Sequence, residues 1–416
     1  MTPADISLVA LLVVIVVSLT SRINIGVLAI ALAAGVAILA AGWSPAQVMG
    51  EFPSVLFLTL VGVTLLFGVA QKNGTLEAMT LRLVRLCGGR VALLPWAFFF
   101  LAGFLSAVGP GATAATALVA PLAMVAGLRA RIPVFLIALL VTNGACAGNL
   151  SPVSSVGIIV LTQMDMAGLP GHDLNVFLAN FVAHTVVALA AYVLFGGLKL
   201  MRAGRTEIEA RPAPFTPIHW LTIAVLAVWI VGVVFFRVDP GVSAFVAAAI
   251  LIIARCCSDK EAIASVPWGI ILMVAGVSVL IGVMSDTGGL ARFTEILASV
   301  ATPGTVNGVM AFVTGVISTY SSTSGVVYPA FLPTVPGLVE QLGGGNPLAI
   351  SLSINVGSAL VDVSPLSTIG ALAVAGLPAN SSEDPARLFR QMLIWGFSMT
   401  IVGALFCQFF IGFFVW

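Results

Sequence analysis

The chain has 416 residues, and 60% of them are hydrophobic. Its 17 Lys or Arg and 16 Asp or Glu residues make up 8% of the chain, whereas a soluble domain has about 25%. Because so few charges cannot cover a water-exposed surface, the composition excludes a soluble enzyme, a nucleic-acid-binding protein and a disordered scaffold. The mean hydropathy of +1.16 indicates a polytopic membrane protein.

Ten apolar stretches have about the 20 residues that a helix needs to cross a bilayer, or more, and they are the predicted membrane spans. Two of them, 132–164 and 347–378, are too long for one simple span and carry a polar break in the middle. Two further apolar regions, 92–128 and 305–339, are predicted to form pairs of short helices joined at a tip, as in re-entrant hairpins. The ten spans are 5–21, 24–42, 53–71, 132–164, 173–199, 217–236, 240–255, 266–285, 347–378 and 385–416.

The halves 1–200 and 217–416 resemble each other across the linker 201–216, which is predicted to be cytoplasmic. The best match pairs residues 151–157 with residues 364–370 at an offset of 213. Each half is predicted to contain five spans and one hairpin that does not cross. Because five is odd, the second half must be inverted relative to the first. We therefore expect an all-α polytopic membrane protein of two inverted repeats, an arrangement typical of secondary transporters.

The basic residues test this topology independently. If the spans are threaded in order, fifteen of the 17 Lys and Arg residues fall on one side, and Arg237 and Arg292 fall on the other. Basic residues are enriched on the cytoplasmic side of membrane proteins. Both termini are therefore expected outside the cytoplasm.

Polar residues gather at the two hairpin tips and at the two helix breaks. Non-helical backbone at membrane depth is tolerated only where it is buried or lines a cavity. A Ser-Pro break frees carbonyls before the proline and exposes amides after it, and these suit a small cation and an anion, respectively. Because tips and breaks match in both halves, they predict a shared binding centre. The candidate substrate-binding residues are Gly109, Pro110, Gly111, Thr113, Ser154, Ser155, Ser321, Ser322, Thr323, Ser367 and Thr368.

Asp362 lies inside an apolar run beside the second break. An intramembrane carboxylate indicates a functional site, and this one could coordinate Na⁺, carry a proton or cap helix amides. Its counterpart in the first half is approximately Asn149. His184 lies within a span and could relay protons or simply pack. Since no Lys or Arg falls near either break, an anionic substrate would be held by hydroxyls, amides and co-bound cations.

The sequence 321–323, Ser-Ser-Thr, resembles the Ser-Asn-Thr hairpin tips of the divalent anion/sodium symporter group within the ion transporter superfamily. The first tip, Gly-Pro-Gly at 109–111, departs from that pattern. From Asp5-Ile6-Ser7-Leu8 to this tip, the first half is similar to MatC-type dicarboxylate carriers, which are associated with malonate uptake.

The resemblance implies a homodimer whose protomers each have a scaffold domain and an elevator-type transport domain. It implies scaffold helices in 1–72 and 217–285 and arms in 73–90 and 286–304, with the hairpins and broken helices forming the transport domain. It also implies two Na⁺ sites, one in each half. Their candidate ligands are Ser106, Gly148 and Asn149 in the first half, and Ser318, Ser321, Ser322 and Asp362 in the second.

These expectations combine into a multi-pass inner-membrane transporter that takes up a small, malonate-like dicarboxylate with Na⁺. Two alternatives stay open: proton coupling through Asp362 or His184, and a membrane subunit of a binding-protein-dependent (tripartite) transporter. An enzyme is not expected, because the sequence has no Ser/His/Asp grouping, metal-ligand cluster or phosphate-binding loop. No nucleic-acid partner is expected.

Overall fold

The computed structural model describes residues 2–20, 23–86, 90–109, 111–201, 214–236, 238–378, 381 and 383–416, and their regular structure is helical. In the first half the helices are α1 (Pro3–Thr20), α2 (Ile25–Gly35) with η1 (Val36–Ala40), α3 (Pro45–Gly50), α4 (Ser54–Lys72), α5 (Thr75–Leu86), η2 (Val91–Leu93), α6 (Leu94–Ala107), α7 (Gly111–Arg129), α8 (Val134–Gly148), α9 (Ser155–Met166), α10 (Asp173–Leu194) and α11 (Gly197–Leu200).

The second half repeats this order of long and short helices. It contains α12 (Pro217–Phe236), α13 (Pro240–Ile253), α14 (Asp259–Ser265), α15 (Trp268–Thr287), α16 (Gly289–Ser299), α17 (Val306–Tyr320), η3 (Thr323–Val327), α18 (Tyr328–Phe331), η4 (Leu332–Thr334), α19 (Val335–Leu342), α20 (Pro347–Leu360), η5 (Val361–Val363), α21 (Thr368–Ala375), α22 (Pro385–Phe410) and η6 (Ile411–Phe414).

Helices form wherever the sequence predicts a span, and both long segments are broken. The segment 132–164 divides into α8 and α9, and 347–378 divides into α20, η5 and α21. Among the described residues, six helical segments are long and apolar enough to cross a membrane. One of them is α7, part of the first predicted hairpin, so length and composition alone do not distinguish a hairpin arm from a span.

The two hairpins differ in regularity. The first consists of two continuous helices, α6 and α7, that pack against each other. In the second, the arm after the tip is divided into η3, α18, η4 and α19. Pro329, Pro333 and Pro336 lie in this arm, and each removes an amide donor that a continuous helix would use. The sequence predicts both hairpins but not this unevenness.

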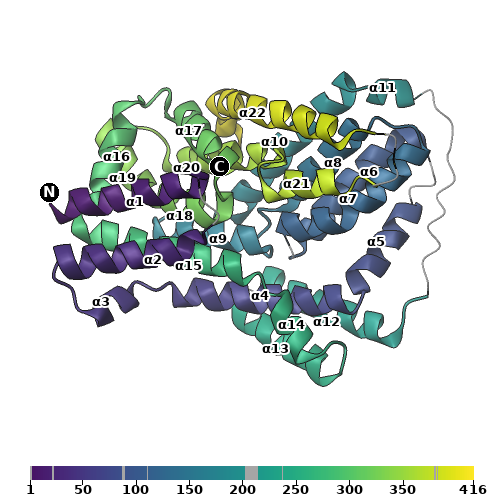
Figure 1. The fold of residues 1–416 in the computed structure, drawn as a ribbon, viewed down its shortest axis with the longest axis horizontal. Coiled ribbons are helices and arrows are strands. Elements are labelled where there is room, and N and C mark those ends of the chain that lie inside the picture. The colour runs from purple at the N-terminus through teal and green to yellow at the C-terminus, as the bar shows by residue number, and fades with distance from the viewer. Residues whose placement is uncertain are drawn as a thin grey trace.

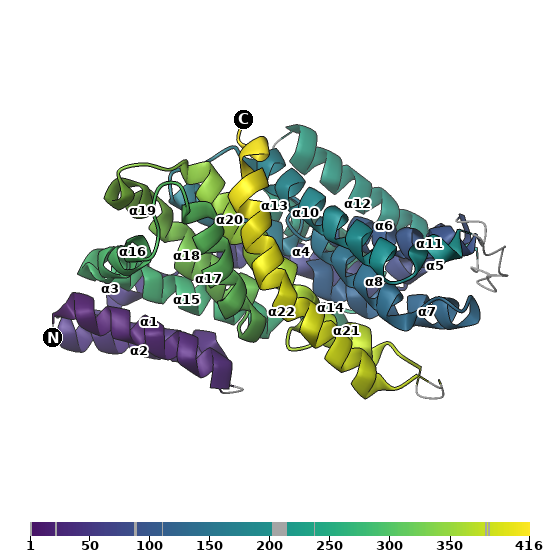
Figure 2. The same cartoon turned by 90° about the horizontal axis from the view of Figure 1, so that it is seen from above.

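The helices pack in two groups (Figure 1). The first helix group consists of α1, α2, α4, α12, α13, α14 and α15, which contact one another in a connected series. The second helix group consists of α6, α7, α8, α10, α17, α20, α21 and α22. In Figure 2, α1 and α2 lie side by side at one edge of the molecule, and α22 runs obliquely across the second group. Between the two groups lie α9, which contacts α4, and η3 and α18, which contact α15.

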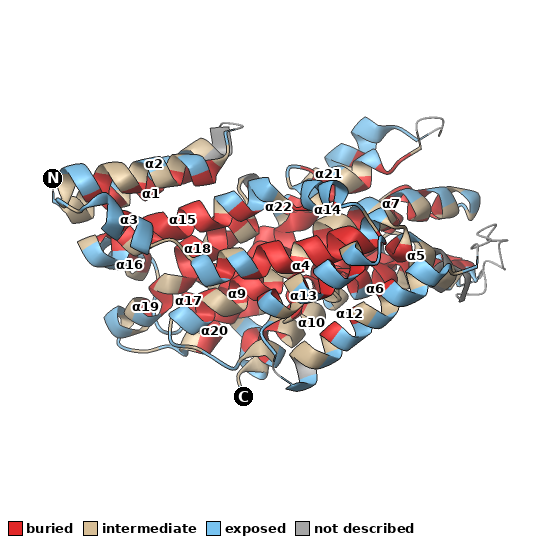
Figure 3. Cartoon of the chain, turned by 90° about the horizontal axis from the view of Figure 1, so that it is seen from below, coloured by how far each residue is buried: buried red, intermediate tan, exposed pale blue. Residues whose placement is uncertain are grey.

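Close helix crossings depend on glycines at matching positions of the two halves. A methyl group at Gly276 would overlap the backbone of Gly26, and one at Gly62 would lie 2.5 Å from the carbonyl oxygen of Gly241. Thus α2 of the first half crosses α15 of the second, while α4 of the first crosses α13 of the second. Buried residues are concentrated along α4, α15 and their neighbours, whereas exposed residues are frequent along α1 and α2 (Figure 3).

In the second helix group, two matching glycine crossings each lie within one half. A methyl group at Gly103 of α6 would lie 3.0 Å from the carbonyl oxygen of Gly144 in α8. At Gly315 of α17 it would lie 3.0 Å from the carbonyl oxygen of Gly357 in α20. The equal distances show that the α6–α8 and α17–α20 pairs cross alike.

Candidate functional site

A cavity of about 650 Å³ lies between the two helix groups and is lined by both hairpin tips and both helix breaks. This volume is within the range of about 300–1,000 Å³ that is usual for small-molecule sites. Among the described lining residues, Asp362 is the only charged side chain, and none is Lys or Arg. The predicted site residues that line it are Gly111, Thr113, Asn149, Ser155, Ser321, Ser322, Thr323, Asp362, Ser367 and Thr368.

The two breaks have the same local hydrogen bonds. Ser154 caps α9 by accepting a hydrogen bond of 3.0 Å from the Gly157 amide, and its hydroxyl donates to the carbonyl oxygen of Asn149. Ser367 caps α21, and its hydroxyl donates to the carbonyl oxygen of Asp362 at 2.7 Å. Each serine therefore ties the new helix start back to the end of the preceding helix. The structure thus places Asn149 and Asp362 at equivalent positions, as the sequence predicts.

The side chains at these equivalent positions also bind the hairpin tip of their own half. Oδ1 of Asn149 accepts a hydrogen bond of 2.9 Å from the Ala112 amide at the start of α7. Oδ1 of Asp362 accepts one of 2.7 Å from the Thr323 hydroxyl at the start of η3. Each tip is thereby held against its break by a polar side chain that also lines the cavity.

Four helical segments begin at this cavity. Their first residues are Gly111 of α7, Ser155 of α9, Thr323 of η3 and Thr368 of α21, and all four line it. The first amides of a helix have no partner within the helix, and the helix dipole places partial positive charge there. The cavity therefore collects hydroxyls and helix N-termini, with no basic side chain among the lining residues that the structure describes, which is an environment for anions.

Some predicted substrate-binding residues do not line the cavity. The φ angle of Gly109 is 149°, and its Cα is packed against the ring of Phe67, so a methyl group there would overlap the ring. Its carbonyl oxygen accepts a hydrogen bond of 3.2 Å from the Ser155 amide. Ser154 is fully buried beneath the helix start that it caps. Pro110 is outside the described residues.

Of the predicted cation ligands of the first half, Asn149 lines the cavity, whereas Ser106 and Gly148 do not. Ser106 is fully buried, and its hydroxyl oxygen has no hydrogen-bond partner among the described residues. A methyl group at Gly148 would lie 2.9 Å from the amide nitrogen of Ala107, so the ends of α6 and α8 are in contact. The unpaired oxygen of Ser106 suits a cation ligand.

In the second half, Thr323 joins two of the predicted cation ligands, Ser318 and Asp362. Ser318 contacts the Thr323 hydroxyl and donates to the carbonyl oxygen of Ser358 at 3.0 Å. Thr323 in turn contacts Asp362. Ser322 lies at the cavity surface and caps η3 through a hydrogen bond of 3.0 Å from the Gly325 amide. Oxygen-only clusters of this kind suit a hard cation, and the described residues contain no group of three or more His, Cys, Asp or Glu side chains that could hold a metal.

His184 is not at the cavity. It is fully buried in α10, and its Nδ1 lies 3.0 Å from Oδ1 of Asn143. Since Nδ2 of Asn143 donates to the carbonyl oxygen of Leu139, its Oδ1 is the acceptor, and His184 carries its proton on Nδ1. This places His184 within the second helix group, away from the residues that line the cavity.

The sequence did not identify the face of the cavity that the first helix group contributes. Thr64 and Gln71 of α4 and Ser265 at the end of α14 are its polar members. Gln71 was visible as an amide at the end of an apolar span, but its position opposite the tips depends on how α4 crosses the other helices.

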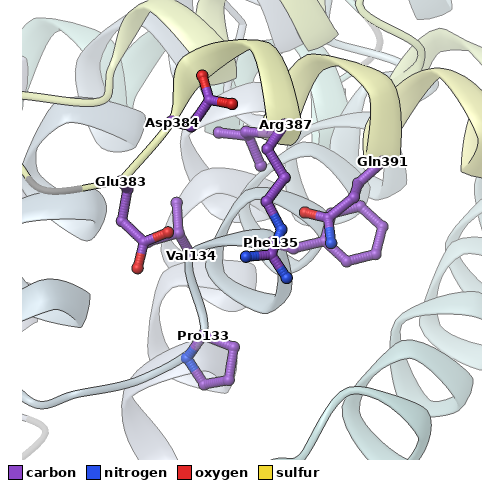
Figure 4. Close-up of a pocket in the computed structure, with 8 residues that line it drawn as sticks. Pro133, Val134, Phe135, Glu383, Asp384, Arg387 and Gln391 are labelled. Carbon is purple, nitrogen blue, oxygen red and sulfur yellow. The ribbon is translucent and has the colours of Figure 1, made fainter.

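A second, smaller cavity of about 190 Å³ lies between the starts of α8 and α22 (Figure 4). Its polar lining residues are Glu383, Asp384, Arg387 and Gln391. Asp384 caps α22 by accepting a hydrogen bond of 2.9 Å from the Ala386 amide. Because this cavity contains neither a hairpin tip nor a helix break, the predicted binding centre corresponds to the larger cavity.

The fold resembles solved transporter structures. The YdaH transporter of Alcanivorax borkumensis superposes with a TM-score of 0.58 at 16% identity, with 88% of each chain covered. MtrF of Neisseria gonorrhoeae, described as representing a class of antimetabolite efflux pumps, superposes with a TM-score of 0.55 at 14% identity, covering 98% of this chain and 95% of MtrF. No curated protein sequence matches the chain.

The chain therefore has the fold of these two transporters. Residues 1–149 match the family described as the N-terminus of the dicarboxylate carrier protein MatC. The N-terminal region of the chain therefore resembles a dicarboxylate carrier, and the resemblance to MatC-type carriers that the sequence indicates is confirmed.

Proposed function

We propose that the protein is a secondary active transporter that takes up a small, malonate-like dicarboxylate together with Na⁺. The observation that carries this proposal is the convergence of four helical N-termini on one cavity whose described lining residues include no Lys or Arg. The match of residues 1–149 to a dicarboxylate carrier supports the substrate class.

The dicarboxylate would be held mainly by backbone amides and hydroxyls. One carboxylate would contact Ser322 and the first amides of η3 and α21, and the other would contact Ser155 and the start of α7. Each helix N-terminus stabilises a nearby negative charge by about 0.3–1 kcal/mol, and more where it is partly buried. Because two charges would leave water with no basic side chain to meet them, co-bound cations would lower the cost of desolvation.

The coupling cations would bind on the inner side of each tip. In the second half, Asp362 supplies a carboxylate, and Ser318, Ser321 and Ser322 supply hydroxyls. In the first half, the oxygens of Ser106, Gly148 and Asn149 would contact a cation, with no carboxylate in the set. The second site therefore has the stronger charge, and we expect it to dominate the affinity for Na⁺.

The helix arrangement supports two inverted repeats. By the positions of their glycines, α2 of the first half corresponds to α13 of the second, and α4 corresponds to α15. The α2–α15 and α4–α13 crossings are therefore the same contact with the two halves interchanged, as a pseudo-two-fold axis requires. The first helix group would be the scaffold domain, and α5 and α16 would be the arms. The second helix group, with the tips and breaks, would be the transport domain that carries the cavity past the scaffold in an elevator motion.

We further propose that the cavity opens toward the cytoplasm in this structure. The exposed lining residues Ile23, Gln71 and Ile270 lie at one end of α2, α4 and α15. These ends neighbour Arg22, Lys72 and the basic loops that the positive-inside rule assigns to the cytoplasm. Both termini would then lie outside, in an inner-membrane protein that forms a homodimer.

Purified protein reconstituted alone in liposomes tests this function. Malonate uptake that requires an inward Na⁺ gradient is the expected result, together with thermal stabilisation by malonate that is larger in NaCl than in choline chloride. Full uptake in Na⁺-free buffer with a proton gradient would show that the coupling ion is the proton and not Na⁺. If uptake needs an added binding protein, the chain is instead a subunit of a tripartite transporter.

A further inference from the structure

Asn180 binds the end of α8 directly before the first break. It lies on α10 and is fully buried. Its Nδ2 donates to the carbonyl oxygen of Cys146 at 2.7 Å and contacts that of Ala147 at 3.3 Å. These are the last carbonyls before Gly148 and Asn149, where α8 ends. The carbonyl oxygen of Cys146 also accepts the Asn149 amide at 3.1 Å. Because carbonyls at a helix C-terminus lack the regular partner four residues on, the Asn180 amide is an outside donor that helps to fix the direction in which these two carbonyls point.

The amide is not needed to fill space. Oδ1 of Asn180 is buried without a hydrogen-bond partner among the described residues, and an unsatisfied buried acceptor costs about 1–3 kcal/mol. A leucine has the same branching at Cγ and fills the site without that cost. The two contacts of Nδ2 are therefore what the asparagine contributes at this position.

In the second half, the equivalent packing is mainly by apolar residues, with Thr400 as a buried polar member. There α22 packs against α20 and η5, and its buried face includes Met392, Gly396 and Met399. Gly396 lies directly against Ser364 of the second break. The second break holds the carboxylate of Asp362, whereas the first break has neutral oxygens only. The end of α20 also has an outside donor, the Ser318 hydroxyl, but that donor comes from the hairpin; among the described residues, only at the first break, the one without a charge, does an amide of the packing helix bind the helix end.

We propose that Asn180 is a positioning residue for the first break. By holding the carbonyls of Cys146 and Ala147, it fixes the direction in which α8 ends, and with it the oxygens of Gly148 and Asn149 that face a small monovalent cation. This inference rests on the proposed cation coupling, and it assigns to α10 a role in ion affinity without contact with the ion.

The test compares Asn180→Leu with a matched control on the same helix. Nδ2 of Asn175 also donates to backbone carbonyls, those of Phe414 at 2.9 Å and Trp416 at 3.2 Å, but these lie at the end of the chain. We expect Asn180→Leu to raise the half-saturating Na⁺ concentration about tenfold. This is the low end of the loss in ion affinity, about 10- to 100-fold, that follows removal of a residue that supports an ion ligand. The readouts are Na⁺-dependent thermal stabilisation at constant ionic strength and malonate uptake.

Asn175→Leu should stay within about twofold of wild type, since it affects no cation ligand. The malonate KM at saturating Na⁺ should change less than the Na⁺ dependence in Asn180→Leu. An unchanged Na⁺ dependence in Asn180→Leu, or the same change in both variants, would overturn the inference. If Asn180→Leu does not fold, Asn180→Ala replaces it.

Cys146 provides a readout that does not depend on the identity of the ion. It is buried, and its own carbonyl accepts the Asn180 hydrogen bond. With the other four cysteines replaced by serine, a small maleimide should label Cys146 faster in Asn180→Leu than in Asn175→Leu. Faster labelling without any Na⁺ response in the wild-type protein would retain the positioning role and reject Na⁺ coupling. Equal labelling alongside a normal wild-type Na⁺ response would reject the positioning role alone.

Discussion

The Thr323 hydroxyl donates a hydrogen bond of 2.7 Å to Oδ1 of Asp362, joining the second hairpin tip to the second helix break. Both residues line the cavity, so a ligand that moves the tip also changes the surroundings of the carboxylate. This contact links the anion-binding and cation-binding parts of the proposed site.

Removing the charge of Asp362 tests that link. We expect Asp362→Asn to weaken the apparent affinity for Na⁺ at least tenfold, about 1.4 kcal/mol, because the amide supplies oxygen but no charge to the cation. Thr323→Val, which removes the hydroxyl and keeps the shape, should have a smaller effect in the same direction. Uptake measured against Na⁺ concentration checks this; unchanged Na⁺ dependence in Asp362→Asn would make the carboxylate structural.

The serine caps separate direct contact with substrate from support of a helix start. Ser322 lines the cavity, whereas Ser154 is buried beneath α9. Loss of either cap should destabilise the protein by about 0.5–2 kcal/mol. We expect Ser322→Ala to raise the malonate KM severalfold, and Ser154→Ala to raise it less, through displaced amides. Ser44→Ala, which removes a cap from α3 away from the cavity, is the control. If Ser322→Ala and Ser154→Ala both keep the wild-type KM, the substrate site is not at these caps.

Labelling of introduced cysteines measures the side of the membrane toward which the cavity opens. In a protein without its native cysteines, Gln71→Cys at the cavity mouth should react with a membrane-impermeant maleimide supplied from the cytoplasmic side, and malonate should slow the reaction. Gln47→Cys on α3 should react from the opposite side. A reporter fused to the C-terminus should be found outside the cytoplasm. Labelling of Gln71→Cys from outside alone, or a cytoplasmic C-terminus, would reverse the topology.

Ionisation of Glu51 is expected to make the stability of the folded protein depend on pH. It lies at the end of α3, and a methyl group at Gly282 would overlap its carboxylate. Partial burial, together with the charge of Asp286, raises the pKa of Glu51. The ionised form is therefore disfavoured in the fold, and the destabilisation develops as pH rises through the raised pKa.

Glu51→Gln should accordingly have a higher Tm than wild type at neutral pH. The difference should fall as the pH is lowered, and vanish below the ordinary glutamate pKa of about 4.3. Thermal unfolding in detergent at several pH values measures this, with Glu340→Gln on α19 as the control for loss of a surface charge. A difference that persists unchanged at acid pH would argue against the raised pKa.

The sequence predicts the parts of the molecule that local chemistry determines. Serine and proline after an apolar run are sufficient to locate the breaks at 151–152 and 364–365, and a fixed offset identifies Asn149 and Asp362 as partners. Ser154 was predicted to bind substrate because a hydroxyl at a break is ambiguous: it can face a ligand or cap the next helix, and burial decides between them. Thr64, Gln71 and Asn180 were missed because their neighbours come from helices distant in the chain.

The glycine crossings also constrain the order in which the protein can be made. The helix that packs against α2 at Gly26 is α15, and the helix that packs against α4 at Gly62 is α13. Both leave the ribosome some two hundred residues after their partners. The α6–α8 pair needs nothing from the second half. During synthesis, the first hairpin can therefore assemble early, whereas α2 and α4 are inserted into the bilayer before the helices that pack against them have been made. Neither half made alone can complete these crossings, but two separately encoded halves inserted together have all the surfaces required to rebuild them.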